Sequence, residues 1–372
     1  MGNRRSQGST SFPRFAIALP LLAAALLGAC TDRRGPPPSS VRVPLAVLGD
    51  SDSHAYQDRL SFPEDDPARG GAHRTTSLQW TEVLVRLRVS EIDPGAWGEW
   101  GFRGRWAALA EAFGQPRRTP RKQDFEFNYA WSGARCVDLV EGSGRQAPRL
   151  AARMRDQRDA WSRGVVVIRV GINDLGTSEA LEAFARDGDS DDNRRIVDAC
   201  LGFIERAVRQ IADVQPKARV LLVGVLDNVD WPRNAGRFTD AGERQRIAAV
   251  LDRFDEDLRA IADAAPNIAF FDDRAFYRAL VGQRALDGRP SYRAVPVRDA
   301  AGAIAFEAAI AEGDAMTQLY LADGHAGTVL NAHWAQAFAE SLRREFGLPV
   351  TPISDAERDA FLMELRAAST AR

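Results

Sequence analysis

The chain has 372 residues, enough for one large α/β domain with insertions or for two small domains. Its 49 basic residues almost balance its 51 acidic ones, so the net charge of −2 gives no electrostatic reason to expect nucleic acid as a partner. No linker-like stretch follows residue 40, and we therefore expect a single domain.

The first 29 residues have the pattern of an export signal. Arginines precede an apolar run over 15–28 that is too short to span a bilayer as a mature helix. The run ends in Leu27-Gly28-Ala29-Cys30, which resembles a bacterial lipobox, in which the cysteine becomes the lipidated first residue. Thr31 follows in place of an aspartate, and by the same resemblance this favours the outer membrane. The alternative is an ordinary secretory signal with a chance cysteine.

The stretch after residue 42 contains the first candidate for chemistry. The apolar run from Pro44 to Leu48 predicts a strand that leads directly into Gly49-Asp50-Ser51. A turn of this kind holds a serine hydroxyl at the carboxyl edge of a sheet, so Ser51 is a candidate nucleophile. The alternative is that Asp50 and Ser51 only cap the next helix.

The sequence from residue 52 to about residue 124 is irregular. Apolar residues at helical spacing predict an amphipathic helix over 79–87, after a polar, turn-rich loop. Clustered tryptophans follow in a glycine-rich segment, with Trp97 and Trp100 at its start. Aromatic faces of this kind can line a substrate groove. The alternative is a small core that pins a long loop.

A second candidate turn lies near residue 130. Alternation of Phe125, Phe127 and Tyr129 predicts a strand, which the Ser132-Gly133 turn would stop before a helix. A glycine at such a turn can offer its backbone N–H to a ligand, because no Cβ blocks the approach.

The middle of the chain alternates strand and helix patterns. A β-branched run over 164–170 predicts a buried parallel strand, and it ends in Gly171-Ile172-Asn173-Asp174. Asn173 can therefore point its amide into the same crevice as Ser51. Further strands are predicted over 219–226 and 268–271, with helices over 196–214 and 243–264. This alternation is typical of a doubly wound parallel sheet.

The last informative stretch is 321–328, which precedes a helix predicted over 329–346. His325 lies there, flanked by Asp323 and by glycines at the mouth of the helix. His54 is too close in sequence to the candidate nucleophile to be the obvious base, although it could line the cleft.

The cysteines leave two possibilities open. In an exported protein Cys136 and Cys200 can form a disulfide, or they can be two free, buried thiols. The sequence contains no metal-binding cluster and no nucleotide-binding glycine loop, so we expect neither a metal nor another cofactor.

Four of these motifs occur in the order of the SGNH (GDSL-type) hydrolase family, which the chain resembles from about Val43 to Phe346. The matching residues are Gly49-Asp50-Ser51, Gly133, Gly171-Ile172-Asn173-Asp174, and Asp323 with His325. The resemblance implies a three-layer α/β/α fold with a doubly wound, mostly parallel sheet. The predicted organisation is a signal peptide over 1–29, a lipidated, proline-rich tether over 30–41, a hydrolase domain over 42–350 with an insertion at about 60–124, and a helical tail over 351–372.

The resemblance also implies roles for individual residues. Ser51 would attack an ester carbonyl and His325 would take its proton, with Asp323 orienting the imidazole. The oxyanion would be bound by the backbone N–H groups of Ser51 and Gly133 and by the side-chain amide of Asn173. The residues predicted to line the substrate site are Asp50, His54, Trp97, Trp100 and Trp131.

One departure from the family's pattern concerns the acid. The family usually has Asp-x-x-His in its final motif, whereas here Ala322 occupies that position and Asp323 is one residue closer to His325. A shorter turn could still bring the carboxylate to the imidazole. In the alternative, His325 leans on a backbone carbonyl and the site is a dyad.

The resemblance implies a serine esterase in the cell envelope, held by lipid at Cys30. Its substrates would be acylated glycans, lysophospholipid or small acyl esters. The runner-up is an O-acyltransferase with the same chemistry. A binding protein that keeps the scaffold without turnover is the alternative from another class. The sequence leaves the oligomeric state open.

Overall fold

The computed structural model describes residues 42–370, except 114–117, 143, 227, 235 and 285–289. The predicted signal peptide, the lipidation site at Cys30 and the tether lie outside the described residues. In the described part, no helix is both long enough and apolar enough to cross a bilayer. The described residues belong to one compact unit.

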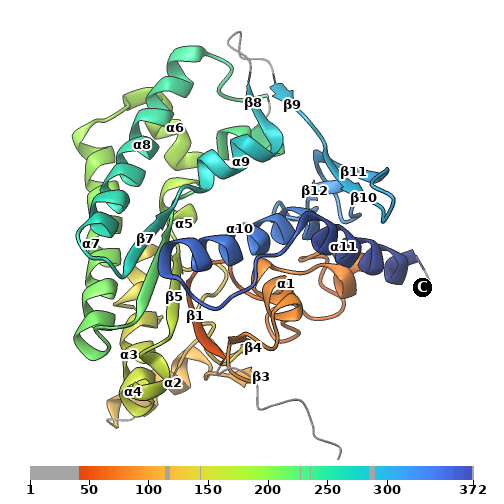
Figure 1. Cartoon of the computed structure of the whole chain (residues 1–372). Coiled ribbons are helices and arrows are strands. Elements are labelled where there is room, and N and C mark those ends of the chain that lie inside the picture. Colours follow the sequence, from red (N-terminus) through yellow and green to blue (C-terminus); the bar gives the residue numbers. More distant parts are fainter. Residues whose placement is uncertain are drawn as a thin grey trace, which may run out of the picture. The chain divides into compact units, whose positions relative to one another are not determined.

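A five-stranded parallel sheet lies at the centre of the described residues (Figure 1). Its strands, in the order in which they lie side by side, are β2 (Ile92–Asp93), β1 (Val43–Gly49), β5 (Val165–Arg169), β6 (Arg219–Val223) and β7 (Ile268–Phe271). The register places Leu45 beside Val165 and Val166 beside Val220. The strand predicted over 219–226 ends at Val223, while the other predicted strands of this sheet are confirmed.

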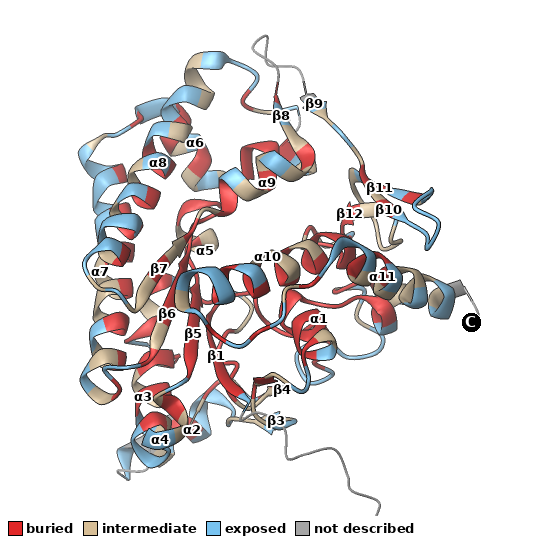
Figure 2. Cartoon of the chain, in the orientation of Figure 1, coloured by how far each residue is buried: buried red, intermediate tan, exposed pale blue. Residues whose placement is uncertain are grey.

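Alternate residues of each central strand face two separate cores, and this is why the strands are apolar throughout. Val165 and Val167 belong to one core, with α1 (Trp80–Leu87), α9 (Asp273–Val281), α10 (Thr328–Phe346) and α11 (Asp355–Thr370). Val166 and Ile168 belong to the other core, with α3 (Gln146–Asp156), α4 (Arg158–Trp161), α6 (Ser178–Asp187), α7 (Asp191–Val214) and α8 (Ala241–Asp263). Figure 2 shows the buried strands between these two helical layers. The predicted α/β/α fold is therefore confirmed.

The helix predictions are correct to within a few residues. α7 begins five residues before the predicted start, because the side chain of Ser190 accepts a hydrogen bond from Asn193 N and caps it. Asp240 caps α8 in the same way by accepting from Glu243 N at 2.9 Å. α1 lies in the range predicted as an insertion, yet its residues pack in the main core against α10.

The strand predicted over 125–129 is wrong in its position. The strand present is β4 (Lys122–Phe125), which pairs antiparallel with β3 (Trp97–Trp100). A turn follows, in which the N–H of Asn128 donates to the carbonyl oxygen of Phe125 at 3.0 Å, and it interrupts the predicted strand. After this turn only Asn128 forms a bridge to β1, where Val47 N donates to Phe127 O at 3.0 Å and Tyr129 N to Val47 O at 2.8 Å. A single 3₁₀ turn, η2 (Cys136–Leu139), stands where a helix was predicted.

Several peripheral elements are present that the sequence pattern did not predict. These are η1 (Gly71–Thr76), α2 (Gly104–Ala112), α5 (Ile172–Leu175), η3 (Asn228–Asp230), η4 (Pro232–Asn234), β8 (Gly282–Arg284), β9 (Pro290–Tyr292), β10 (Val295–Arg298), β11 (Ile304–Glu312) and β12 (Gln318–Tyr320). The last three form a small sheet in the order β10-β11-β12. β12 matters for the site, because the turn that carries Asp323 and His325 follows it directly.

Candidate active site

A cavity of about 330 Å³ brings four of the predicted residues together. Ser51, Asn173, Asp323 and His325 all line it, although they lie up to 274 residues apart in the chain. Its wall also contains Asp52, Leu226, Asn228, Trp231, Tyr320 and Trp334. In the described part of the chain the Ser51 hydroxyl makes no hydrogen bond with His325.

Close contact between β1 and β5 sets the position of Ser51. A Cβ on Gly49 would lie 2.1 Å from the carbonyl oxygen of Arg169, so only glycine fits where the strand ends. The next carboxylate, Asp50, points inward, and one of its oxygens accepts the N–H of Asp52 at 3.0 Å. Burial and the nearby Asp52 charge raise the pKa of Asp50 well above its usual value. Asp50 is not among the residues lining the cavity, and its carboxylate instead holds the backbone of the turn.

Beneath this turn lies the buried guanidinium of Arg169. It donates to the carbonyl oxygen of Asp52 at 3.0 Å and to the Asp273 carboxylate at 2.9 Å, and it lies 3.9 Å from the ring centre of Trp334. The indole N–H of Trp334 donates to the other Asp273 oxygen at 2.6 Å. The turn that carries Ser51 therefore rests on a paired and hydrogen-bonded ion pair rather than on apolar packing alone.

A tight turn after β12 positions Asp323 and His325. Gly324 between them has φ +88°, and a Cβ there would lie 2.3 Å from the ring of Trp231. The backbone of Leu321 donates back to the carbonyl oxygen of His325 at 2.7 Å and closes the turn. Asp323 Oδ1 then lies 3.1 Å from His325 Nδ1. The shorter Asp-x-His spacing thus still brings the carboxylate within hydrogen-bonding distance of the imidazole.

Arg69 joins this turn to the rest of the site. Its backbone N–H donates to Asp323 Oδ2 at 2.9 Å, and its Nη1 contacts the same oxygen and lies 2.7 Å from His325 Nδ1. Its Nη2 donates to Ser132 Oγ at 3.0 Å. Its side chain is buried over the ring of Phe62, and its φ of +59° is unusual for a residue with a side chain.

These contacts determine the charge state of Asp323. Burial alone would raise the pKa of its carboxyl group, but the hydrogen bond and charge of His325 and the charge of Arg69 hold that pKa well below its usual range. Sequence reasoning missed Arg69, because it lies in a polar loop 254 residues from the aspartate that it contacts.

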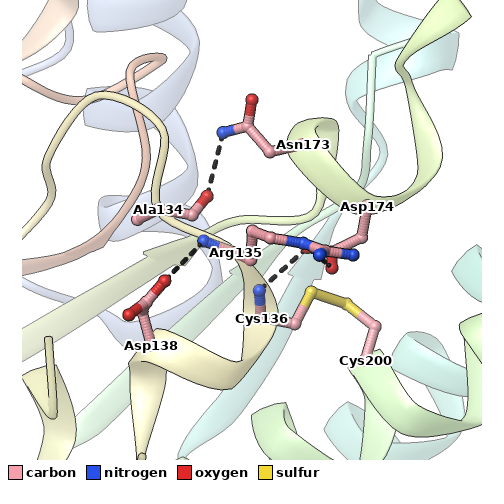
Figure 3. Close-up of a disulfide and its surroundings, with 7 residues drawn as sticks. All are labelled: Ala134, Arg135, Cys136, Asp138, Asn173, Asp174 and Cys200. Carbon is pink, nitrogen blue, oxygen red and sulfur yellow. Dashed lines mark hydrogen bonds and ion pairs between the residues drawn. A yellow bond between two sulfur atoms is a disulfide. The ribbon is translucent and has the colours of Figure 1, made fainter. Parts of the chain in front are cut away.

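Asn173 is hydrogen-bonded to Ala134, the residue that follows Gly133. Asn173, in α5, donates its amide to the carbonyl oxygen of Ala134 at 2.9 Å, next to Gly133 (Figure 3). Gly171, which precedes α5, has φ +125°, and a Cβ there would lie 2.9 Å from Val225. Gly133 itself is exposed with φ +86° and is not among the residues that line the cavity.

A disulfide joins Cys136 of η2 to Cys200 of α7 (Figure 3). Beside it, the carboxylate of Asp174 accepts the backbone N–H of Cys136 and the Nε–H of Arg135, both at 2.9 Å. Of the two possibilities that the sequence left open, the structure contains the disulfide. Cys136, Asp174 and Cys200 also form the one described cluster with the residue types of a metal site, but the bonded sulfur atoms offer no thiolate.

His54 is buried away from the cavity. Its Nε2 lies 2.9 Å from Asp58 Oδ2, and its Nδ1 accepts the backbone N–H of Ser132 at 3.2 Å. Burial, together with the charge of Lys122, lowers the pKa of His54 to about 4, so the ring is neutral near pH 7. It therefore holds the turn before Gly133 and does not line the cleft.

The structure does not bring the predicted tryptophans to the cavity. Trp97 and Trp100 lie on β3, and Trp131 contacts Gly49 only through a backbone hydrogen bond of 3.3 Å. Two other tryptophans, Trp231 and Trp334, line the cavity instead. The sequence does not indicate that these two tryptophans reach the cavity, since Trp334 lies within a helix and Trp231 in a short irregular stretch.

Comparison with solved structures found proteins with low identity to this chain. A lipase from a goat rumen metagenome is 14% identical, with 67% of this chain and 90% of that chain covered and a TM-score of 0.32. A family 3 carbohydrate esterase from Clostridium thermocellum is 13% identical, with 82% and 98% covered and a TM-score of 0.34. An extracellular lipase from Streptomyces rimosus is 17% identical, with 67% and 86% covered and a TM-score of 0.31. No curated protein matches the chain.

The model of the GDSL-like lipase/acylhydrolase family matches residues 90–292, more than half of the chain. This range includes Gly133 and Asn173, whereas Ser51 and His325 lie outside it, on elements that the structure brings to the same cavity. The chain belongs to the GDSL-like lipase/acylhydrolase family and is an ester-hydrolysing enzyme.

Proposed function

We propose that the chain hydrolyses carboxylic esters through an acyl-enzyme on Ser51, with His325 as general base and acid. One observation carries the proposal: Ser51, Asn173 and His325 line one cavity, and the Asp323 carboxylate lies on Nδ1 of the imidazole. Nucleophile, base and orienting acid are the parts that this chemistry requires.

The proton positions follow from the partners of His325. A proton on Nδ1, donated to Asp323 Oδ1, leaves Nε2 free to accept the proton of Ser51. Arg69 Nη1 also lies close to Nδ1, but it is a donor and cannot share that nitrogen with a proton. In the productive state the Nη1–H of Arg69 therefore donates its hydrogen bond to Asp323 Oδ2, which it already contacts.

The reaction then has two balanced steps. Ser51 Oγ bonds to the ester carbonyl carbon while its proton passes to His325, and the same proton leaves with the alcohol as the C–O bond breaks. Water next repeats this sequence on the acyl-enzyme, releases the acid and restores Ser51.

The developing negative charge on the carbonyl oxygen needs hydrogen-bond donors. We assign these to the backbone N–H of Ser51 and the amide of Asn173, which both line the cavity, and to the backbone N–H of Gly133, which lies outside the cavity wall and beside Ala134. Donors of this kind typically lower the barrier by about 3 kcal/mol each. The bond from Asn173 to Ala134 supports this assignment, because it ties the amide to the residue after Gly133.

Labelling with a fluorophosphonate probe tests the nucleophile. We expect covalent labelling of the wild-type protein at Ser51, none in Ser51→Ala, and hydrolysis of short-chain p-nitrophenyl esters by the wild type alone. A wild-type protein that is neither labelled nor active on any such ester would instead be a binding protein on this scaffold. Acyl transfer to an added sugar in preference to water would make it an O-acyltransferase.

We further propose that the enzyme is a lipoprotein, processed before Cys30 and held at the outer membrane on the periplasmic side. The lipobox-like Leu27-Gly28-Ala29-Cys30 and the following Thr31 support this. Metabolic labelling with an alkyne fatty acid should mark the wild type and not Cys30→Ser, and membrane fractionation should find only the wild type with the outer membrane. Release of both proteins in soluble form would contradict the anchor.

A further inference from the structure

A second hollow, separate from the cavity at Ser51, lies beside β3. We call it the Trp97 pocket. Its volume is about 590 Å³, within the range of small-molecule sites. Its walls include the rings of Trp97 and Phe125, the aliphatic side chains of Val85 and Val89, and the cations Arg59 and Arg86.

The aromatic part of the pocket is held rigidly. Trp97 and Phe125 face each other across the β3–β4 ladder, and their ring centres lie 5.1 Å apart, edge to face. Trp97 nevertheless keeps 39% of its surface exposed. A fixed and partly open indole is a flat apolar surface on which a ring can stack at little cost in side-chain entropy.

The pocket wall contains two cations, Arg59 and Arg86, and one acid, Glu82. In the part of the chain that the structure describes, the guanidinium groups of Arg59 and Arg86 form neither a hydrogen bond nor an ion pair, and the charge of Arg86 acts on the Glu82 carboxyl group. The one acid in the wall, Glu82, is buried and turned to the backbone, where it accepts the N–H groups of Tyr56 and Gln79 at 3.0 and 2.9 Å.

Glu82 also carries less negative charge than an exposed glutamate would. Burial raises the pKa of its carboxyl group to about 7, although the N–H groups of Gln79 and Tyr56 and the charge of Arg86 act in the opposite direction. Two cations beside a rigid ring, with one buried acid, therefore favour a ligand that combines an anionic group with a flat apolar face.

We propose that the Trp97 pocket binds an acidic sugar of an acylated glycan, stacked on Trp97 with its anionic group between Arg59 and Arg86. This proposal rests on the proposed esterase activity. The pocket holds one sugar of the glycan while an ester on the same glycan reaches Ser51. Gln57 in the pocket wall lies six positions after Ser51, so their Cα atoms lie at most about 22 Å apart.

Binding can be measured without turnover, by calorimetry on the full chain carrying Ser51→Ala. The probes are a tri-uronate, a sulfated trisaccharide and a neutral trisaccharide. We expect the anionic probes to bind at least tenfold more tightly than the neutral one, and more weakly as salt rises. The first two probes distinguish a carboxylate from a sulfate. Equal affinity for the neutral sugar, or no binding by any probe, would overturn the proposal.

Matched variants locate the site. Trp97→Ala and the double change Arg59→Ala/Arg86→Ala should each weaken anionic-sugar binding at least tenfold. As controls, Trp106→Ala removes another exposed tryptophan and Arg163→Ala another exposed arginine, both outside the pocket wall, and neither should change the affinity. An unchanged affinity in Trp97→Ala, or an equal loss in the controls, would contradict the assignment.

Kinetics separate this proposal from the esterase activity itself. With catalytically competent Ser51, Trp97→Ala should raise KM for an acetylated tri-uronate at least tenfold and leave kcat/KM for p-nitrophenyl acetate unchanged. If the wild type hydrolyses neither ester but still binds the anionic sugar at Trp97, the esterase proposal fails and the binding site stands. If it hydrolyses p-nitrophenyl acetate and Trp97→Ala changes neither KM nor binding, the pocket proposal fails alone.

Discussion

The two sides of the cavity are held in place by different kinds of contact. On the nucleophile side, Ser51 and Asn173 follow β1 and β5, whose backbones are hydrogen-bonded along the whole strand. On the histidine side, Asp323 and His325 belong to a turn at the edge of a small sheet, and a side chain from a distant loop, Arg69, contacts both.

The two sides should therefore respond differently to mutation. A strand end keeps its position when one side chain is changed, because the backbone ladder holds it. A turn held by the charged contacts of one arginine loses its geometry when that arginine is removed. Changes on the nucleophile side should therefore remove single chemical groups, whereas changes on the histidine side should disturb positioning.

The largest effect is expected for Asp323→Asn. An amide cannot support the imidazolium or impose the same ring tautomer, so kcat for a p-nitrophenyl ester should fall by about 10⁴-fold. Steady-state kinetics at fixed pH would measure this, with circular dichroism to confirm folding. Nearly full activity in this variant, with Ser51→Ala inactive, would show that the site is a dyad.

The next effect concerns stability on the nucleophile side. The Cys136–Cys200 bond closes a loop with a sequence separation of 64, and its loss should lower the free energy of unfolding by about 4 kcal/mol. Urea unfolding of the double variant Cys136→Ser/Cys200→Ser would measure this. The reduced wild type should match the variant, and agreement of both with the oxidised protein would contradict the prediction.

Asn173→Ala should remove one oxyanion donor and leave the nucleophile side folded. We expect kcat to fall by about 10²- to 10³-fold with little change in KM, because the interaction is strongest in the transition state. Fluorophosphonate labelling should be slower but still occur at Ser51. A large rise in KM with unchanged kcat would assign Asn173 to substrate binding instead.

Arg69→Gln tests the histidine side directly. It removes the charge beside Asp323 and misplaces the turn, and we expect kcat to fall by about 100-fold. KM for a small ester should not change, since Arg69 is not among the residues that line the cavity. Arg69→Lys keeps the charge and should recover part of the activity. Full activity in Arg69→Gln would contradict a positioning role.

The smallest effect concerns acid stability through His54. Its folded pKa of about 4 lies below the unfolded value of 6.5, so the unfolded chain binds this proton first and stability is lost as pH falls from 6.5 towards 4. Between pH 6.5 and pH 5 this amounts to about 1.5 kcal/mol. Urea unfolding of His54→Gln at both pH values should show a loss smaller by that amount. An identical loss of unfolding free energy in both proteins would show that protonation of His54 does not cause the loss.

The prediction of the fold from the sequence was good where the signal was local. The runs over 164–170 and 268–271 are apolar on both faces, and β5 and β7 occur there. The alternating pattern over 125–129 failed, because a turn in which the N–H of Asn128 donates to the carbonyl oxygen of Phe125 interrupts the strand. Local periodicity does not show such a turn.

Ser51, Asn173 and His325 could be named from the sequence, because short motifs at strand ends and helix mouths are local features of the chain. The tertiary structure alone decided that Arg69 reaches Asp323, that Cys136 meets Cys200, and that Trp97 belongs to a second pocket. The physical reason is the same each time. A contact between side chains far apart in the chain depends on how the backbone packs in three dimensions. The residues next to each side chain in the sequence therefore do not predict it.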